Sequence, residues 1–264
     1  MNPVEVAQGD SPVILGLPHT GTFLPDDIFA ALTPRGQVLA DTDWHIHRLY
    51  GGLLPGATTV RATFHRYVID ANRGPDDASL YPGQNTTGLV PLTDFDGAPI
   101  WKSEPGAEDI ATRKARFHAP YHAALAAEIE RVRARHGVAI LYDCHSIRSV
   151  IPFLFDGVLP DFNIGTNSGA SCAPAIEAAT QEVASATGRT WVVNGRFKGG
   201  WTTRHYGQPR AGVHAIQMEL AQSTHLTSET PPFAYDEAKA AALRVPLRDI
   251  LHRLAALAPQ LVTP

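Results

Sequence analysis

Short apolar runs alternate along the chain with longer amphipathic stretches, which is the pattern of strands interleaved with helices. The predicted strands are rich in β-branched residues and lie at 12–17, 58–62, 66–71, 138–143, 151–155, 190–194 and 214–220. The predicted helices lie at 43–53, 107–136, 172–187 and 234–257. This order of elements predicts an α/β fold.

Two long stretches, 73–105 and 195–212, interrupt this pattern. The first is rich in Gly, Pro, Asp and Thr, and the second carries cations and aromatic residues among five glycines. Irregular segments of this length are uncommon in compact domains and are usually functional where they occur. We expect both segments to fold over a pocket at one edge of the sheet.

The bulk composition limits the class of protein. A length of 264 residues with 44% hydrophobic content fits one domain over residues 1–264. The net charge of -4 argues against a nucleic-acid partner, because phosphate binding usually needs a basic stripe.

The first 21 residues carry no basic leader and no long apolar run, so we predict neither membrane insertion nor export, and expect a cytoplasmic protein. Cys144 and Cys172 are too few for a disulfide framework and fit a reducing compartment.

Polar clusters follow four of the predicted strands. They contain His19, the stretch from Asp70 to Arg73, the stretch from Asp143 to His145, and Glu219. Ligands of α/β sheets bind beyond the carboxyl ends of the strands, so these clusters are predicted to meet in one crevice.

Two histidines from separate strands and one carboxylate form the ligand set of a catalytic zinc, which leaves a fourth position open. His19 and His145 are the natural pair. The third ligand is sought in the stretch "ADTDWHIH", where Asp43 is favoured and Asp41 and His45 are alternatives. Either aspartate could instead cap the predicted helix.

Glu219 ends an apolar strand, where a carboxylate facing the core is costly unless it is paired or lies near a cation. A metal-activated water would be such a partner. Glu219 could then accept the proton of the water and pass it to the leaving amine, as a general acid and base. The alternative is an exposed glutamate at the strand end.

The stretch "DANR" joins an acid, an amide and a guanidinium directly after a predicted strand. Arg73 has the planar geometry that binds a carboxylate with two hydrogen bonds, Asn72 can donate to the same group, and Asp70 could orient Arg73. Arg66 could stabilise an oxyanion, although a surface arginine is an equally good interpretation.

Two further segments contribute candidates. His118 and His122 share a helix face; they could form a second metal site, but the simpler interpretation is that they line the pocket, with His122 against the substrate. In 195–212 the cations that could bind a second anionic group are Arg196, Lys198, Arg204 and His205, of which we select Arg204.

In the stretch "YDCHS", the alternation of side chains along a strand shows which residues share a face. Asp143 and His145 share one face, and Cys144 points to the other. We therefore expect Asp143 to hold the imidazole of His145 and Cys144 to pack in the core. Arg148 is a further candidate for substrate binding.

At "PHTG", "DTDWH", "RYVIDANR", "PYH", "DCHS" and "MEL" the sequence resembles the N-formylglutamate amidohydrolase family, from His19 to Glu219. The resemblance implies hydrolysis of N-formyl-L-glutamate to formate and L-glutamate, the closing step of one bacterial route of histidine degradation. That family looks like a distant relative of zinc carboxypeptidases and aspartoacylase. A zinc-carboxypeptidase-like (phosphorylase/hydrolase-like) domain, with a mixed, mainly parallel sheet flanked by helices, is therefore implied.

In those enzymes a His and a carboxylate bind the metal, an Asn-Arg pair binds the substrate carboxylate, and a second His ligand and a late Glu base follow. The order of His19, Asn72 with Arg73, His145 and Glu219 reproduces this arrangement. The departure is the absence of a Glu three residues after His19, which is why the carboxylate is sought in "DTDWH".

The leading hypothesis is an amidohydrolase that uses one divalent metal, with Zn²⁺ as the first choice, on a small-molecule substrate. Within the same class, the alternatives are a deacylase of another N-acyl amino acid and a carboxypeptidase-like hydrolase. A cysteine hydrolase would use Cys144 as its nucleophile, but adjacent strand residues such as Cys144 and His145 point to opposite faces. The non-enzymatic alternative is a protein that binds a carboxylate metabolite. No feature of the sequence predicts an oligomeric state.

Overall fold

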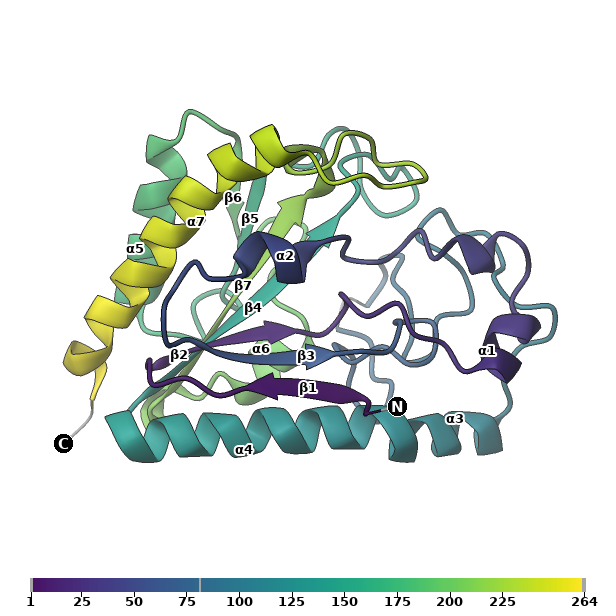
Figure 1. Cartoon of the computed structure of the whole chain (residues 1–264), viewed down its shortest axis with the longest axis horizontal. Helices are drawn as coiled ribbons and strands as arrows, with labels where there is room; N and C mark the ends of the chain where they lie inside the picture. Colours follow the sequence, from purple (N-terminus) through teal and green to yellow (C-terminus); the bar gives the residue numbers. More distant parts are fainter. Residues whose placement is uncertain (1, 81, 263–264) are drawn as a thin grey trace.

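A single seven-stranded sheet organises the computed structural model, which describes residues 2–80 and 82–262 (Figure 1). Residue 81 of the predicted 73–105 loop and the two chain ends therefore lie outside the described residues. The strands lie in the order β1–β3–β2–β4–β7–β5–β6. Their bounds are Val4–Ala7 (β1), Val13–Leu17 (β2), Thr58–Ala62 (β3), Ala139–Ile147 (β4), Phe162–Gly165 (β5), Trp191–Val193 (β6) and Val213–Ala221 (β7).

The directions of the strands confirm a mixed, mainly parallel sheet. β2 pairs in parallel with β3 and β4, β4 with β7, and β5 with β6. β1 pairs with β3, and β5 with β7, in the antiparallel direction. The carboxyl ends of β2, β3, β4 and β7 therefore point to the same edge of the sheet, as the predicted crevice requires.

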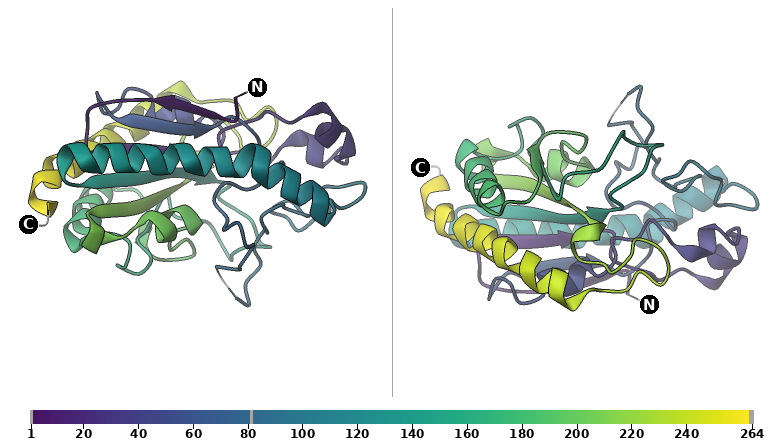
Figure 2. Two further views of the ribbon diagram at one scale, coloured as in Figure 1. Left: turned by 90° about the horizontal axis from the view of Figure 1, so that it is seen from below. Right: turned by 90° about the horizontal axis from the view of Figure 1, so that it is seen from above.

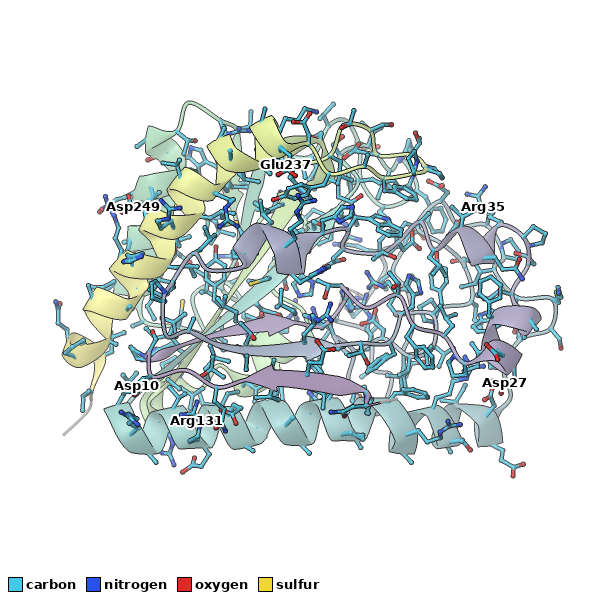
Figure 3. All side chains as sticks on the ribbon, in the orientation of Figure 1. Asp10, Asp27, Arg35, Arg131, Glu237 and Asp249 are labelled. Carbon is cyan, nitrogen blue, oxygen red and sulfur yellow. The ribbon has the colours of Figure 1, made fainter. Side chains whose placement is uncertain are left out.

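Helices cover both faces of the sheet (Figures 1 and 2). On one face lie α3 (Ala107–Arg113), α4 (Ala119–His136) and the short α6 (Trp201–Tyr206), and on the other lie α2 (Ile46–Tyr50), α5 (Pro174–Ala186) and α7 (Glu237–Leu257). α1 (Asp26–Ala31) lies beside the sheet. On α7 the labelled charged residues Glu237 and Asp249 are exposed, while its apolar side packs in the core (Figure 3).

Alternate residues of β4 pack into two different cores, one on each face of the sheet. Ala139 and Leu141 belong to the core under α4, whereas Tyr142 and Cys144 belong to the core under α5 and α7. Side chains alternate along a strand, so the face of Leu141 also carries the next odd-numbered residues of β4.

Two predicted strands are wrong. Residues 66–71 form turns, because their backbone groups bond outside the sheet: Val68 N–H donates to His65 O, and the Arg113 guanidinium donates to the carbonyls of Tyr67 and Val68. Their side chains are buried all the same, which produces the strand-like apolar run. Residues 151–155 also form a turn, in which Leu154 N–H donates to Ile151 O.

The ends of other helices and strands also differ from the predicted ones. β4 continues to Ile147, four residues beyond the predicted end, because its polar residues remain in the ladder with β7. The predicted helix 107–136 is continuous but contains a π turn at Lys114–His118, which ends two residues before Pro120. The ring of a proline inside a helix clashes with the preceding α-helical turn. β1, β5, α1 and α6 were not predicted; each is six residues or shorter. No helix in the described ranges is long and apolar enough to cross a membrane.

Candidate metal centre and active site

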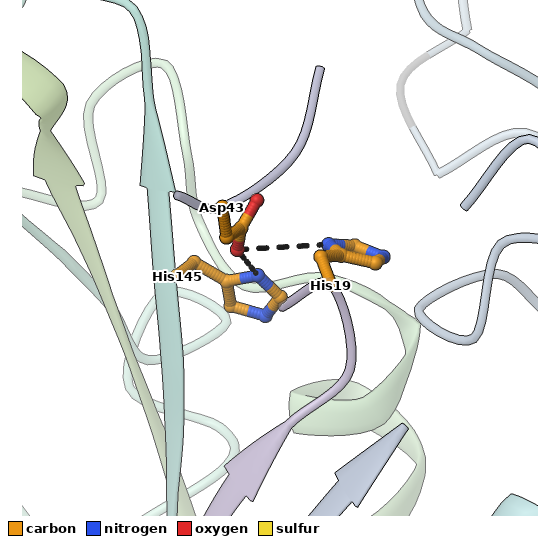
Figure 4. Close-up of side chains that lie close together, drawn as sticks. All are labelled: His19, Asp43 and His145. Atoms are coloured by element: carbon orange, nitrogen blue, oxygen red, sulfur yellow. Dashed lines mark hydrogen bonds and ion pairs between the residues drawn. The ribbon is translucent and has the colours of Figure 1, made fainter. Parts of the chain in front are cut away.

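Three buried side chains converge at the carboxyl edge of the sheet (Figure 4). His19 lies two residues beyond β2, Asp43 precedes α2, and His145 lies within β4. The backbone joins the first two, because Asp43 N–H donates to His19 O over 3.1 Å. Among the residues that the structure describes, this is the one group of His, Cys, Asp and Glu side chains arranged to hold a metal ion.

The geometry of the three donors suits one ion. One ligand atom from each residue lies within 4.8 Å of the others. Asp43 Oδ2 is 3.1 Å from His145 Nδ1 and 3.8 Å from His19 Nδ1. Two imidazoles and one carboxylate form a known ligand set of catalytic zinc.

Each imidazole has a carboxylate on its other nitrogen. His19 Nε2 is 2.7 Å from Asp70 Oδ1, and His145 Nε2 is 3.2 Å from Asp143 Oδ1. At His19 the carboxylate keeps the proton on Nε2 and leaves Nδ1 as the ligand nitrogen. At His145, Nε2 also lies 3.1 Å from Asn72 Nδ2. Asp143 thus lies where the alternation along the strand placed it.

Burial and the neighbouring charges shift the pKa values of the two imidazoles in opposite directions. Burial, and then Arg66, lower the pKa of His19, so its imidazole is held neutral. Burial alone would also lower the pKa of His145, but Asp143 and Asp43 raise it well above its usual value. A metal ion would therefore have to displace the proton of His145, which lies between two carboxylates. Metal affinity should decrease as the pH is lowered.

The alternatives to Asp43 face elsewhere. Asp41 Oδ2 accepts hydrogen bonds from the Tyr67 hydroxyl at 2.7 Å and from Phe95 N–H at 3.0 Å. His45 Nε2 is 2.9 Å from Phe233 O. The structure therefore brings Asp43, and neither Asp41 nor His45, to the two histidines.

Asp70 orients Arg66, where the sequence suggested Arg73. Its Oδ2 accepts from Arg66 Nη2 over 2.6 Å, and its Oδ1 also accepts from Asn72 N–H. Burial would raise the pKa of Asp70, but Arg66 and His19 hold it well below its usual range. Arg66 is thereby fixed beside the donors, with its guanidinium above the ring of Phe95.

Glu219 lies next to His145 on the adjacent strand, because the two residues are paired in the ladder between β7 and β4. Its side chain is buried, and Gln217 Nε2 donates to its Oε2 over 3.0 Å. Burial raises the pKa of Glu219 to about 8. A bound cation would lower this value again by favouring the carboxylate form.

These groups line a cavity of about 600 Å³, a volume that includes the solvent at its mouth. Both long irregular segments contribute side chains to it. The lining residues are His19, Asp43, Arg66, Asn72, Arg73, Thr86, Thr87, Phe95, His145, Ser146, Ile147, Leu154, Arg196, Phe197, Gly200, Gln217 and Glu219.

Three predicted substrate contacts do not line this cavity in the described part of the chain. Arg204 donates to the carbonyl oxygens of Gly199 and Leu80. Arg148 pairs with Asp96 at 2.9 Å. From the segment of Arg204, the arginine that lines the cavity is Arg196.

His122 is the third of these residues, and with His118 it supports the loop around Asn72. Each Nε2 lies 2.9 Å from a backbone oxygen, that of Ala71 for His122 and that of Arg73 for His118. The two imidazoles thus hold the backbone on both sides of Asn72, which explains the helix face they share. In the described part of the chain, neither His118 nor His122 belongs to a group of side chains that could hold a metal ion.

Cys144 lies on the opposite face of the sheet from His145. It is fully buried in the core, its Sγ contacts Tyr142 O, and burial raises its pKa well above the usual value. A protonated thiol on the wrong face cannot serve as a nucleophile in this cavity.

Two residues that line the cavity, Arg196 and Gln217, were not selected from the sequence, although Arg196 was among the candidate cations. The signal for Gln217 was present, since it precedes Glu219 by two residues and so shares its face of β7. Nothing in the sequence distinguished Arg196 from the other cations of its segment.

The site is of the kind found in amidohydrolases that act on small molecules. Comparison with known proteins identifies the family: the model of N-formylglutamate amidohydrolases matches residues 11–226, and the chain belongs to this family. It is 49% identical over 253 residues to an N-formylglutamate deformylase of Pseudomonas aeruginosa and 47% identical to one of Pseudomonas putida, covering 94% of each chain in both cases. The crystal structure of an N-formylglutamate amidohydrolase from Ralstonia eutropha JMP134 superposes with a TM-score of 0.84 at 25% identity, over 98% of this chain and 99% of that one.

Proposed function

We propose that this protein hydrolyses N-formyl-L-glutamate to formate and L-glutamate and depends on one divalent metal, with Zn²⁺ as the best match to the donors. The observation that carries the proposal is the buried group of His19, Asp43 and His145 at a cavity lined by three arginines. The names of the Pseudomonas relatives support the substrate. The reaction would serve histidine degradation, as the family resemblance implies.

The ligands in this proposal are His19 Nδ1, His145 Nδ1 and a carboxylate oxygen of Asp43. When bound, the ion supplies a Lewis acid that polarises the formyl carbonyl and lowers the pKa of a water molecule. Asp70 and Asp143 hold the two imidazoles in the orientation that the ligands need.

Glu219 moves the proton. As a carboxylate, it takes a proton from the attacking water and then delivers it to the amide nitrogen of the leaving glutamate. Arg66 lines the cavity and is held by Asp70 through Nη2, so its guanidinium can donate to the developing negative charge on the formyl oxygen.

N-formylglutamate carries two carboxylates, and the cavity offers two arginines besides Arg66. Arg73 lines the cavity, and its guanidinium donates to Thr87 O and Thr86 Oγ1. Arg196 lies on the other irregular segment, where it donates to the carbonyls of Leu154 and Asn85. We assign one carboxylate to Arg73 with Asn72 and the other to Arg196, in place of Arg204.

Replacing Arg73 by Met should raise the KM for N-formylglutamate by about 10- to 100-fold, since a hydrogen-bonded charge pair with the substrate is lost. Arg204→Met is the matched control from the same predicted set, and its KM should change by less than about threefold. Steady-state formate release measures both. Equal KM values for the two variants, or a larger effect at Arg204, would contradict the assignment.

The function itself is tested by incubating the purified protein with N-formyl-L-glutamate, N-acetyl-L-glutamate and N-formyl-L-leucine, and measuring the free amino acid. We expect N-formyl-L-glutamate to give the highest kcat/KM. A preference for the acetyl compound would indicate a different deacylase. Saturable binding without any turnover would indicate a metabolite-binding protein.

A further inference from the structure

Gln217 is a buried amide beside the proposed base. It lies in the middle of β7, lines the cavity, and is 3% exposed. A polar side chain at such a position costs free energy unless its hydrogen bonds are made. Both ends of the amide have partners, and these partners determine which way it points.

Gly200 N–H donates to Gln217 Oε1 over 2.6 Å. A backbone N–H can only donate, so the oxygen of the amide must face Gly200, and its NH₂ group must face Glu219. There Nε2 donates to Glu219 Oε2 over 3.0 Å. A flipped amide would place donor against donor at Gly200 and, whenever Glu219 is a carboxylate, acceptor against acceptor at Glu219.

The position of Gly200 is itself tightly determined. A Cβ atom on Gly200 would lie 2.3 Å from Asn72 Nδ2, so the backbone approaches Asn72 as only glycine permits. Two residues later, Thr202 N–H donates to Asn72 Oδ1. The same turn of backbone therefore holds Asn72 on one side and Gln217 on the other.

This arrangement makes the two oxygens of Glu219 unequal. Oε2 is held by Gln217, whereas no protein hydrogen bond reaches Oε1 within the described chain. We propose that Gln217 is a positioning residue: it holds Oε2 and thereby presents Oε1 of Glu219 to the attacking water. The inference rests on the proposed function, because it acts only through Glu219.

Gln217→Met tests the inference, since Met has nearly the same length and shape but cannot donate. Relative to the wild type, kcat for formate release should fall by about 10- to 100-fold, the usual cost of losing a hydrogen bond to a charged group. KM should stay within about threefold and the metal content should be unchanged, because neither substrate nor metal contacts are removed.

Ser171→Ala is the matched structural control. Ser171 Oγ donates to Ala215 O on the same strand as Gln217, and its side chain is equally buried, but it does not line the cavity. The two variants should lose a similar amount of thermal stability, while kcat of Ser171→Ala stays within about twofold of the wild type.

A double-mutant cycle with Glu219→Gln then separates positioning from packing. If Gln217 acts through Glu219, Gln217→Met should change the residual kcat of the Glu219→Gln enzyme by less than about twofold. An equal loss in both backgrounds would overturn the inference, as would an increase of KM at constant kcat, which would make Gln217 a substrate contact. A wild-type protein that releases no formate would overturn the proposed function first, and the inference with it.

Discussion

Glu219→Gln is expected to lower kcat for formate release by about 10³-fold, within the range that general acid-base catalysis supplies. The substitution keeps the size of the side chain and removes its ability to accept and return a proton. Glu219 is a buried carboxyl opposite His145 on the neighbouring strand, and no other glutamate lines the cavity in the described residues. KM and metal content should change little, because Glu219 is not among the proposed ligands. Steady-state kinetics and elemental analysis of the same preparation measure the three quantities together.

Glu128→Gln is the control for loss of a buried carboxylate. Glu128 on α4 is also buried, and it pairs with Arg131 and Gln8 away from the cavity. Its kcat should remain within about twofold of the wild type. A Glu219→Gln enzyme with undiminished kcat would eliminate Glu219 as the base.

Asp43→Ala should have the second largest effect, with loss of the metal and of activity together. Replacing a residue that only hydrogen-bonds to a metal ligand typically lowers metal affinity by roughly 10- to 100-fold, and loss of a ligand itself should lower it more. The carboxylate lies 3.1 Å from His145 Nδ1 and also accepts from Ser146 N–H, so its removal opens the centre of the donor group. Metal content after dialysis measures the loss, and kcat should be recovered in part at high metal concentration.

Asp41→Asn distinguishes ligand loss from loss of a buried acid. Asp41 is as buried as Asp43, but it bonds Tyr67 and Phe95, and burial raises its pKa to about 6. This variant should lose thermal stability and keep its metal. If instead Asp41→Asn lost the metal while Asp43→Ala retained it, the ligand assignment would be reversed.

Much of the fold and the donor group could be predicted because the relevant signals are local. Alternation along β4 separates His145 from Cys144 whatever the rest of the chain does. The apolar runs of β2 and β7 predict strands, because both faces of these inner strands are buried in a mainly parallel sheet. The carboxyl-terminal ends of neighbouring parallel strands lie at one edge, which is why His19, just after β2, and His145, near the end of β4, converge.

What could not be predicted depends on contacts between distant segments. The buried run at 66–71 looks like a strand, but Arg113, more than forty positions later, satisfies its carbonyls. Arg204 and Arg196 are equivalent in the sequence, and only the path of the irregular segment decides which of them lines the cavity. The bond between Asp70 and Arg66 likewise follows from the turn that the sequence pattern concealed.

The central claim is that His19, Asp43 and His145 hold one catalytic metal ion. The most direct test is the metal content of the purified protein, measured alongside formate release from N-formyl-L-glutamate before chelation, after chelation, and after Zn²⁺ is returned. The account predicts one ion per chain, loss of formate release on chelation, and recovery when about one equivalent of Zn²⁺ is restored. A metal-free protein with undiminished formate release would contradict it.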